Sequence, residues 1–287
     1  MKYPAGRRKG RLTPVPAIVI AVLAVAVTAC AAPASAPSGP SAPSAPSASG
    51  LAHVTPAVAA QLTEVTAIPF KASDADWANV PLTQLTPHAG PPLIAGGKPE
   101  VLYVGTEFCP YCAAETWALL VALGRFGTFT GVNEIRSASY PPVPPLDSWT
   151  FYGSSYSSEY LTFVPVETYS NVLVSPRADP LKAASYRLLQ KLTPAQRALM
   201  NEADKAHATP FTDFGGQAVM IGSPVPALTL EHLTWSQLAS ALRARRGAAA
   251  QAVIGAADYI TAELCTLTRN RPATACPASI KDFQPVS

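Results

Sequence analysis

Residues 100–126 read EVLYVGTEFCPYCAAETWALLVALGRF. The first part, Glu100–Gly105, is a short apolar run rich in strand-forming residues, which predicts a buried strand. The last part, residues 113–126, is apolar nearly all round, and its only charges are Glu115 and Arg125. Such a pattern predicts a helix that is buried on most sides. We therefore expect a strand, a tight turn and a helix in immediate succession.

The turn between this strand and this helix carries the motif Cys109-Pro110-Tyr111-Cys112. Pro110 suits a first helical turn, where its missing N–H would be unpaired anyway. Free backbone N–H groups and the positive end of the helix dipole stabilise a thiolate, so they should lower the pKa of Cys109 from about 8.5 and make it a nucleophile. Cys112, one turn further on, lies on the same face and can act as the resolving thiol. The motif thus predicts a redox-active dithiol.

Two other interpretations of the motif remain open. A zinc knuckle would need two more ligands, but the sequence has no second C-x-x-C and its histidines, His53, His88, His207 and His232, are widely scattered. A purely structural disulfide is unusual at a helix start. We assign no metal ligand and expect no cofactor.

The N-terminal 29 residues are typical of a targeting segment. A basic stretch, Arg7–Arg11, precedes an apolar run, Val15–Ala29, which has the length of a signal-peptide core and is short for a membrane span. Cys30 ends the run in the manner of a bacterial lipoprotein signal, which predicts lipidation of its sulfur. The alternative is an uncleaved helical anchor with Cys30 an incidental thiol. Either arrangement places the rest of the chain on the extracytoplasmic face of the cell membrane.

Residues 30–50 form a spacer, because every residue from Ala31 to Gly50 is Ala, Pro, Ser or Gly. Such a composition cannot bury a core, and its prolines favour an extended chain of about 3.1 Å per residue. We expect the spacer to hold the domain away from the membrane.

Charge excludes one class of partner. The chain has 21 basic and 18 acidic residues, and five of the basic ones but none of the acidic ones precede residue 30. The remainder therefore carries a net charge of −2, and no basic run interleaved with aromatic residues follows. We expect no nucleic-acid partner.

The remaining pattern predicts further elements of an α/β domain. Residues 148–152 and 160–167 are strand-like and aromatic, with Ser154–Ser158 as the loop between them. A capping box at Thr193 and the residues before it predict a helical pair between about 178 and 207. Residues 209–222 predict a β-hairpin with a Gly-Gly turn, and a second capping box, at Thr234, predicts a helix to about residue 243.

The C-terminal part, residues 249–287, begins with a largely apolar helical stretch and contains Cys265 and Cys276. With Cys30 set aside, the chain has an even number of thiols in an oxidising location, which predicts two pairs. A structural disulfide between Cys265 and Cys276 would contribute roughly 2–3 kcal/mol by closing a short loop. The alternative is a second redox pair that relays electrons to the first dithiol.

On these motifs the chain resembles the thioredoxin-like proteins of archaea and actinobacteria grouped as domain of unknown function 929. The matching segments are residues 103–112, Trp117, residues 125–127, 151–156 and 210–216, and the two late cysteines. The resemblance implies a thioredoxin-like fold over residues 51–248, with a helical insertion before a cis-proline strand and a C-terminal helical extension. It also implies that Thr209 and a cis Pro210 lie beside the dithiol; the alternative is an ordinary trans-proline at the start of a strand. Phe108 departs from the Trp usual in thioredoxin, and Pro110 and Tyr111 resemble the glutaredoxin dipeptide.

These features together predict an extracytoplasmic thiol-disulfide oxidoreductase that acts on the cysteines of exported proteins. Cys109 and Cys112 would be catalytic, and Thr209, Pro210, Pro110 and Tyr111 would position the substrate. A redox partner is implied but not identified, and neither is the direction of electron transfer. The alternatives are a cell-surface binding or assembly lipoprotein with a structural disulfide, and a protein that delivers copper or zinc through its dithiol.

Overall fold

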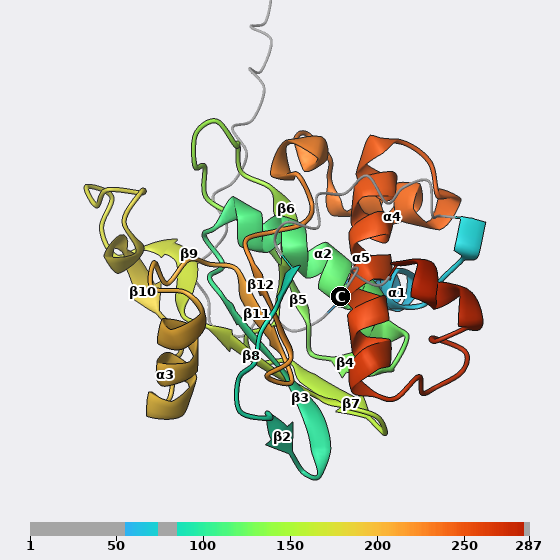
Figure 1. Cartoon of the computed structure of the whole chain (residues 1–287). Coiled ribbons are helices and arrows are strands. Elements are labelled where there is room, and N and C mark those ends of the chain that lie inside the picture. Colours follow the sequence, from blue (N-terminus) through green and yellow to red (C-terminus); the bar gives the residue numbers. More distant parts are fainter. Residues whose placement is uncertain (1–54, 74–84, 284–287) are drawn as a thin grey trace, which may run out of the picture. The chain divides into compact units, whose positions relative to one another are not determined.

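The computed structural model describes residues 55–73 and 85–283, which fold as an α/β domain (Figure 1). The predicted signal or anchor, the spacer and Cys30 lie outside these residues. No helix in the described ranges is long and apolar enough to cross a membrane.

A mixed sheet with β3 (Lys98–Gly105) near its centre organises the domain. β3 pairs in parallel with β8 (Thr162–Glu167) and antiparallel with β11 (Phe211–Phe214). The sheet is completed by β12 (Ala218–Ile221), which pairs antiparallel with β11, and by the short strands β1 (Leu85–Pro87) and β2 (Ile94–Ala95). β11 and β12 are the predicted hairpin.

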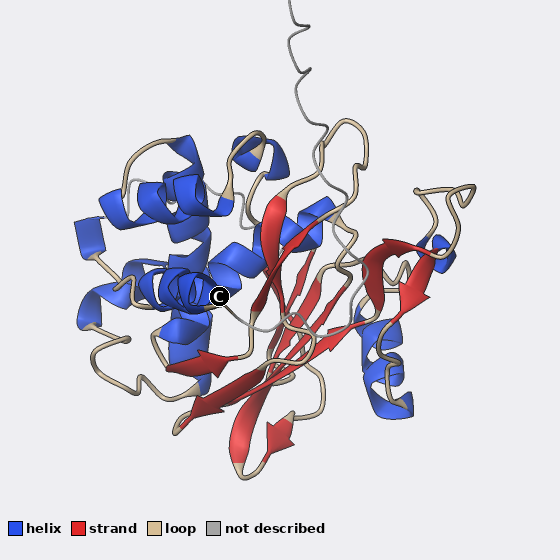
Figure 2. Ribbon diagram, turned by 180° about the vertical axis from the view of Figure 1, so that it is seen from behind, coloured by secondary structure: helices blue, strands red, loops and turns tan. Residues whose placement is uncertain are grey.

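Both faces of the sheet are covered, which explains why β3 is a continuous apolar run rather than an alternating one. Val101 and Tyr103 pack into the larger core, whereas Leu102 and Val104 face a smaller cluster that includes Leu199 of α3. Figures 1 and 2 show the helices divided accordingly between the two sides of the sheet. One side carries α1 (Pro56–Thr66), α2 (Pro110–Gly124), α4 (Trp235–Ala244) and α5 (Ala248–Leu267), and the other carries α3 (Pro194–Ala203).

Three two-stranded ribbons extend the domain. They are β4 (Gly127–Thr130) with β7 (Ser155–Ser158), β5 (Asn133–Arg136) with β6 (Asp147–Thr150), and β9 (Tyr169–Leu173) with β10 (Tyr186–Leu188). The predicted loop at residues 154–158 is wrong for all but its first residue, because pairing with β4 makes Ser155–Ser158 a strand. Serine has little strand preference, so here tertiary pairing overrides local propensity.

Of the two helices predicted between about residues 178 and 207, only the second is present. α3 exists and carries the predicted capping box at Thr193. The segment before it forms only a 3₁₀ turn, Ala183–Ser185, followed by β10. The buried side chain of Tyr186 stacks on Phe108 with ring centroids 4.2 Å apart, and β10 pairs with β9. These contacts are available only in the folded chain and favour a strand over a helix.

The helix predicted for the C-terminal extension, from residue 249, is confirmed by α5, and α4 before it begins at the predicted capping box of Thr234. α5 packs along α2, and a buried ion pair of 2.7 Å joins Arg125 to Asp258 of α5. The extension therefore covers the helix that carries the dithiol. A disulfide joins Cys265 to Cys276, with the two Cα atoms 5.6 Å apart.

Candidate functional site

The dithiol lies where β3 ends and α2 begins, as predicted. Cys109 is the N-cap residue of α2, in extended backbone geometry, and Pro110 opens the helix. The backbone N–H of Cys112 donates a hydrogen bond to the Cys109 sulfur over 3.4 Å. The two cysteines are free thiols in the structure. A sulfur at an N-cap lies among unpaired backbone N–H groups, which favour its thiolate form.

Thr209 and Pro210 lie beside this thiol. The Thr209–Pro210 peptide bond is cis, as the resemblance implies, and the Thr209 carbonyl oxygen is 3.8 Å from the Cys109 sulfur. The pairing of β11 with β3 brings the two segments together, because Phe211 lies opposite Val104. The fold thus brings Thr209 and Pro210 to the Cys109-Pro110-Tyr111-Cys112 motif.

The two thiols differ in access to solvent and in acidity. Cys109 is 8% exposed and Cys112 is 2% exposed. A hydrogen bond from the Cys112 thiol lowers the pKa of Cys109, and backbone N–H groups of Cys112 and Tyr111 add to this effect, whereas burial opposes it. Burial raises the pKa of Cys112 well above its ordinary value. Cys109 is therefore suited to be the nucleophile and Cys112 the thiol that must be deprotonated later.

Aromatic side chains surround the dithiol. Phe108 stacks on Tyr186 of β10, and Tyr111, which is 36% exposed, meets Tyr140 edge to face with ring centroids 6.3 Å apart. The sequence alone did not identify Tyr140 or Tyr186 as neighbours of the motif, because both lie in segments that reach it only through the fold.

Two fully buried carboxyl groups lie in the same region, and sequence reasoning assigned neither to the site. Glu115 accepts a hydrogen bond of 2.7 Å from the hydroxyl of Thr212, and Glu167 accepts one of 3.4 Å from the backbone N–H of Phe151. Among the described residues, the second oxygen of each carboxyl has no hydrogen-bond partner. An isolated carboxylate is costly to bury, so both groups favour the protonated form.

The acidity of these carboxyl groups is coupled to the dithiol. Burial raises the pKa of Glu115 to about 8, and the charges of Cys109 and Glu167 add to the rise. Burial likewise raises the pKa of Glu167 to about 8, with further contributions from Glu107 and Cys109. The one signal in the sequence was Glu115 itself, a lone acid in an otherwise apolar helix.

Tyr103 is a third buried polar side chain near Glu115 and Glu167, and its hydroxyl lies against Gly105. A Cβ atom at Gly105 would collide with the Tyr103 hydroxyl oxygen, so no larger residue fits at this position of β3 without displacing the ring. Burial raises the pKa of Tyr103 well above its ordinary value, and the charges of Glu167, Cys112 and Glu115 add to the rise. The phenol therefore stays neutral and can act only as a neutral hydrogen-bonding group.

The family model described as domain of unknown function (DUF929) matches residues 89–266. The chain belongs to this family. The match covers β3, the dithiol, the Thr209–Pro210 bond and most of α5, so the whole site of this DUF929 member lies within it. Comparison with curated proteins and with solved structures found no match.

Metal-ligating residues do not gather at the dithiol. Within residues 55–73 and 85–283, no group of three or more His, Cys, Asp or Glu side chains could hold a metal ion.

Proposed function

We propose that this DUF929 member is a thiol-disulfide oxidoreductase of thioredoxin-like fold that acts on the cysteines of exported proteins. The observation that carries the proposal is the position of the Cys109 sulfur, which lies at the N-cap of α2 and 3.8 Å from the Thr209 carbonyl oxygen. A nucleophilic thiol beside a strand end can form a mixed disulfide while the partner chain lies along the neighbouring backbone.

The sheet topology supports the thioredoxin-like assignment. The strands run in the order β8, β3, β11 and β12, with β3 and β8 parallel and the last two antiparallel to their neighbours. Along the chain, a strand leads into the C-x-x-C helix, and the cis-proline is followed by a hairpin and then by helices. This is the order of elements in thioredoxin.

The reaction begins with attack of the Cys109 thiolate on a disulfide of the partner. A bond forms between Cys109 and one partner sulfur, the partner disulfide breaks, and the other partner sulfur leaves as a thiolate. Cys112 then attacks the Cys109 sulfur and releases the second partner thiol. The partner is reduced by two electrons and the dithiol is oxidised to a disulfide; the same steps in reverse oxidise a partner dithiol.

The second step requires removal of the Cys112 proton, and the buried carboxyl groups supply an acceptor. Loss of the Cys109 negative charge in the mixed disulfide lowers the pKa of Glu167, because that charge helps to raise it. In the fraction of molecules in which the carboxyl is ionised, Glu167 can accept the proton of Cys112. The negative charge of Glu167 adds to the raised pKa of Cys112, whose main cause is burial, so the two groups are electrostatically coupled.

Location and partners follow from the sequence features outside the described residues. A lipid on Cys30, or an uncleaved N-terminal helix, would hold the domain on the extracytoplasmic face of the cell membrane, with residues 30–50 as the spacer. Exported proteins acquire their disulfides in that compartment, so they are the proposed substrates, and a separate redox partner would regenerate the dithiol.

The proposal is tested with the full chain and a model protein disulfide. Cys109→Ser should abolish turnover, and Cys112→Ser should accumulate mixed disulfides that can be isolated from cells and identified. The double variant Cys265→Ala/Cys276→Ala is the matched control and should keep its activity. A Cys109→Ser variant as active as the parent would sink the proposal, and would favour a binding or assembly protein that uses the fold without its thiols.

A further inference from the structure

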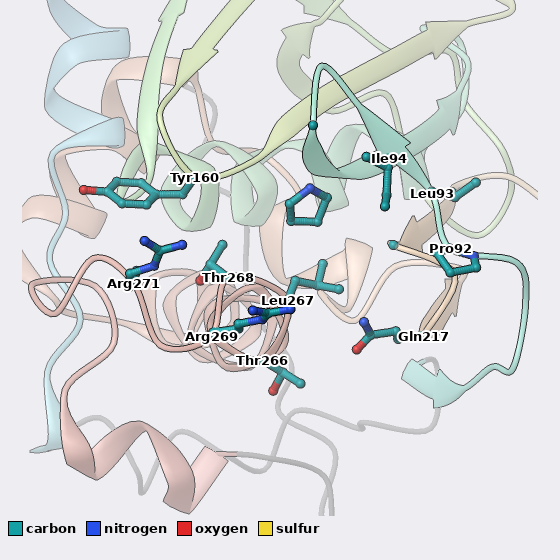
Figure 3. Close-up of a pocket in the computed structure, with 13 residues that line it drawn as sticks. Pro92, Leu93, Ile94, Tyr160, Gln217, Thr266, Leu267, Thr268, Arg269 and Arg271 are labelled. Atoms are coloured by element: carbon teal, nitrogen blue, oxygen red, sulfur yellow. The ribbon is translucent and has the colours of Figure 1, made fainter.

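A pocket of about 400 Å³ lies at the opposite end of β3 from the dithiol (Figure 3). Pro99, at the start of the strand, lines the pocket, whereas the dithiol follows Gly105, at its end. An eight-residue strand spans roughly 20 Å or more, so the two sites are separate. The pocket has the volume of a small-molecule site.

Four segments that are distant in sequence form this pocket. They are the turn around β2, Tyr160 before β8, the β11–β12 turn, and the C-terminal end of α5 with the loop that follows it. Leu93, Pro99 and Leu267 supply apolar surface, and Ile94 is 65% exposed beside them.

Two guanidinium groups, of Arg269 and Arg271, give the pocket its charge. Figure 3 shows Arg271 below Tyr160 and Arg269 nearer the centre of the view, with Ile94 at the upper right. Among the residues that the structure describes, no acidic one lines the pocket. Neither guanidinium forms an ion pair with any residue that the structure describes. Their positive charge is therefore available to a ligand.

The loop that carries these arginines is held in place before any ligand arrives. The Cys265–Cys276 disulfide encloses it, the Asn270 N–H donates to the Cys265 carbonyl over 2.7 Å, and the Cys276 N–H donates to the Pro272 carbonyl over 3.0 Å. Arg269 and Asn270 have φ angles of 55° and 59°. Asn adopts left-handed backbone readily, but for Arg269 it is unfavourable and persists where the surroundings enforce it. Preorganisation of this kind lowers the entropy lost on binding.

We propose that the pocket binds a small organic anion, whose phosphate or carboxylate group is held by Arg269 and Arg271 and whose apolar part lies against Leu93, Pro99 and Leu267. Planar guanidinium groups match both oxyanions through paired hydrogen bonds. Gln217, at the β11–β12 turn, supplies a further polar group. This binding site does not depend on the proposed thiol chemistry.

The test uses phenylglyoxal, which modifies arginine, on the full chain in mild detergent at constant ionic strength. Phenyl phosphate and benzoate are the two probes, phenol is the neutral control, and modification of each arginine is followed by peptide mass spectrometry. A probe at ten times its dissociation constant should slow modification of Arg269 and Arg271 about tenfold. Exposed Arg197 and Arg246 are the internal controls and should react at their original rate.

Each outcome bears on the proposal. Protection by phenyl phosphate alone assigns a phosphate-bearing ligand, and protection by benzoate assigns a carboxylate. The proposed site would be overturned if neither probe protected Arg269 and Arg271. It would also be overturned if Arg197 and Arg246 were protected equally, or if phenol protected the arginines. Turnover of a model disulfide, measured on the same samples, reports on the dithiol separately.

Variants at the arginines and at the disulfide test the proposed site in a second way. Arg271→Gln should remove the protection of Arg269, because the pair binds the anion together, whereas the matched Arg246→Gln should leave it unchanged. Cys265→Ala/Cys276→Ala should weaken protection by releasing the loop. Full protection of Arg269 in the Arg271→Gln variant would show that the two guanidinium groups do not form one site.

Discussion

The sulfur of Cys109 lies 3.8 Å from the carbonyl oxygen of Thr209, although 100 residues separate them along the chain. The antiparallel pairing of β11 with β3 produces this proximity. A thiol that is reactive because it caps a helix is thereby placed next to a backbone segment at the end of a strand.

The acidity of Cys109 should depend on the Cys112 thiol. Its hydrogen bond is the largest cause of the lowered pKa of Cys109, so Cys112→Ala should raise that pKa and Cys112→Ser, which keeps a donor, should raise it less. The rate of Cys109 alkylation as a function of pH measures both values. Equal pKa values in the two variants and the parent would assign the effect to the backbone N–H groups and Thr209 instead.

Resolution of the mixed disulfide should depend on Glu167. Glu167→Gln keeps the size of the side chain but removes the proton acceptor, so the attack of Cys112 should slow by about 10²-fold or more, while the first attack by Cys109 is preserved. Rapid-quench measurement of the mixed disulfide separates the two steps. Exposed Glu159→Gln is the matched control. A slowed first step in Glu167→Gln would indicate a general disturbance of the site instead.

The stability of the domain should fall as the pH rises from about 4.5 to about 8. In the unfolded chain Glu115 loses its proton near 4.5, whereas in the folded chain it keeps the proton up to about 8. The folded state therefore binds more protons in this window, and the free energy of unfolding decreases with pH.

Glu115→Gln removes the part of this dependence that comes from Glu115, while the part from Glu167 stays, and the variant can still accept the Thr212 hydrogen bond. Urea unfolding should show the variant to be more stable than the parent at pH 9, by on the order of a few kcal/mol, with the difference shrinking toward pH 4.5. A difference that is constant across this range would contradict a buried, protonated Glu115. Glu159→Gln again serves as the exposed control.

The Cys265–Cys276 disulfide should contribute to stability without taking part in the thiol chemistry. Its removal in Cys265→Ala/Cys276→Ala should lower the free energy of unfolding by roughly 2–3 kcal/mol. Denaturant unfolding measures this loss, and turnover of a model disulfide should stay at the parental level. A matching loss of turnover would instead favour a relay of electrons between the two cysteine pairs.

The dithiol and its position on a helix start could be predicted from the sequence, because the determinants are local. An apolar strand, a proline in the first helical turn and an apolar helix all lie within residues 100–126. The hairpin at residues 209–222 and the capping boxes at Thr193 and Thr234 were predictable for the same reason. Each depends on residues a few positions apart.

Local rules failed where a distant partner decides the structure. Ser155–Ser158 form a strand because β4 pairs with them, and Tyr186–Leu188 form a strand because β9 does. The carboxyl group of Glu167 was equally unpredictable as part of the site, because only the parallel pairing of β8 with β3 carries it to the dithiol end of the sheet.

The sequence by itself determined that Cys109 would cap a helix and that Cys112 would follow it one turn later, since backbone propensity and capping act over a few residues. Only the tertiary structure decided which groups tune these thiols. Thr209, Glu115 and Glu167 come together through strand pairing and burial, and a carboxyl group changes its pKa only when water is excluded from it.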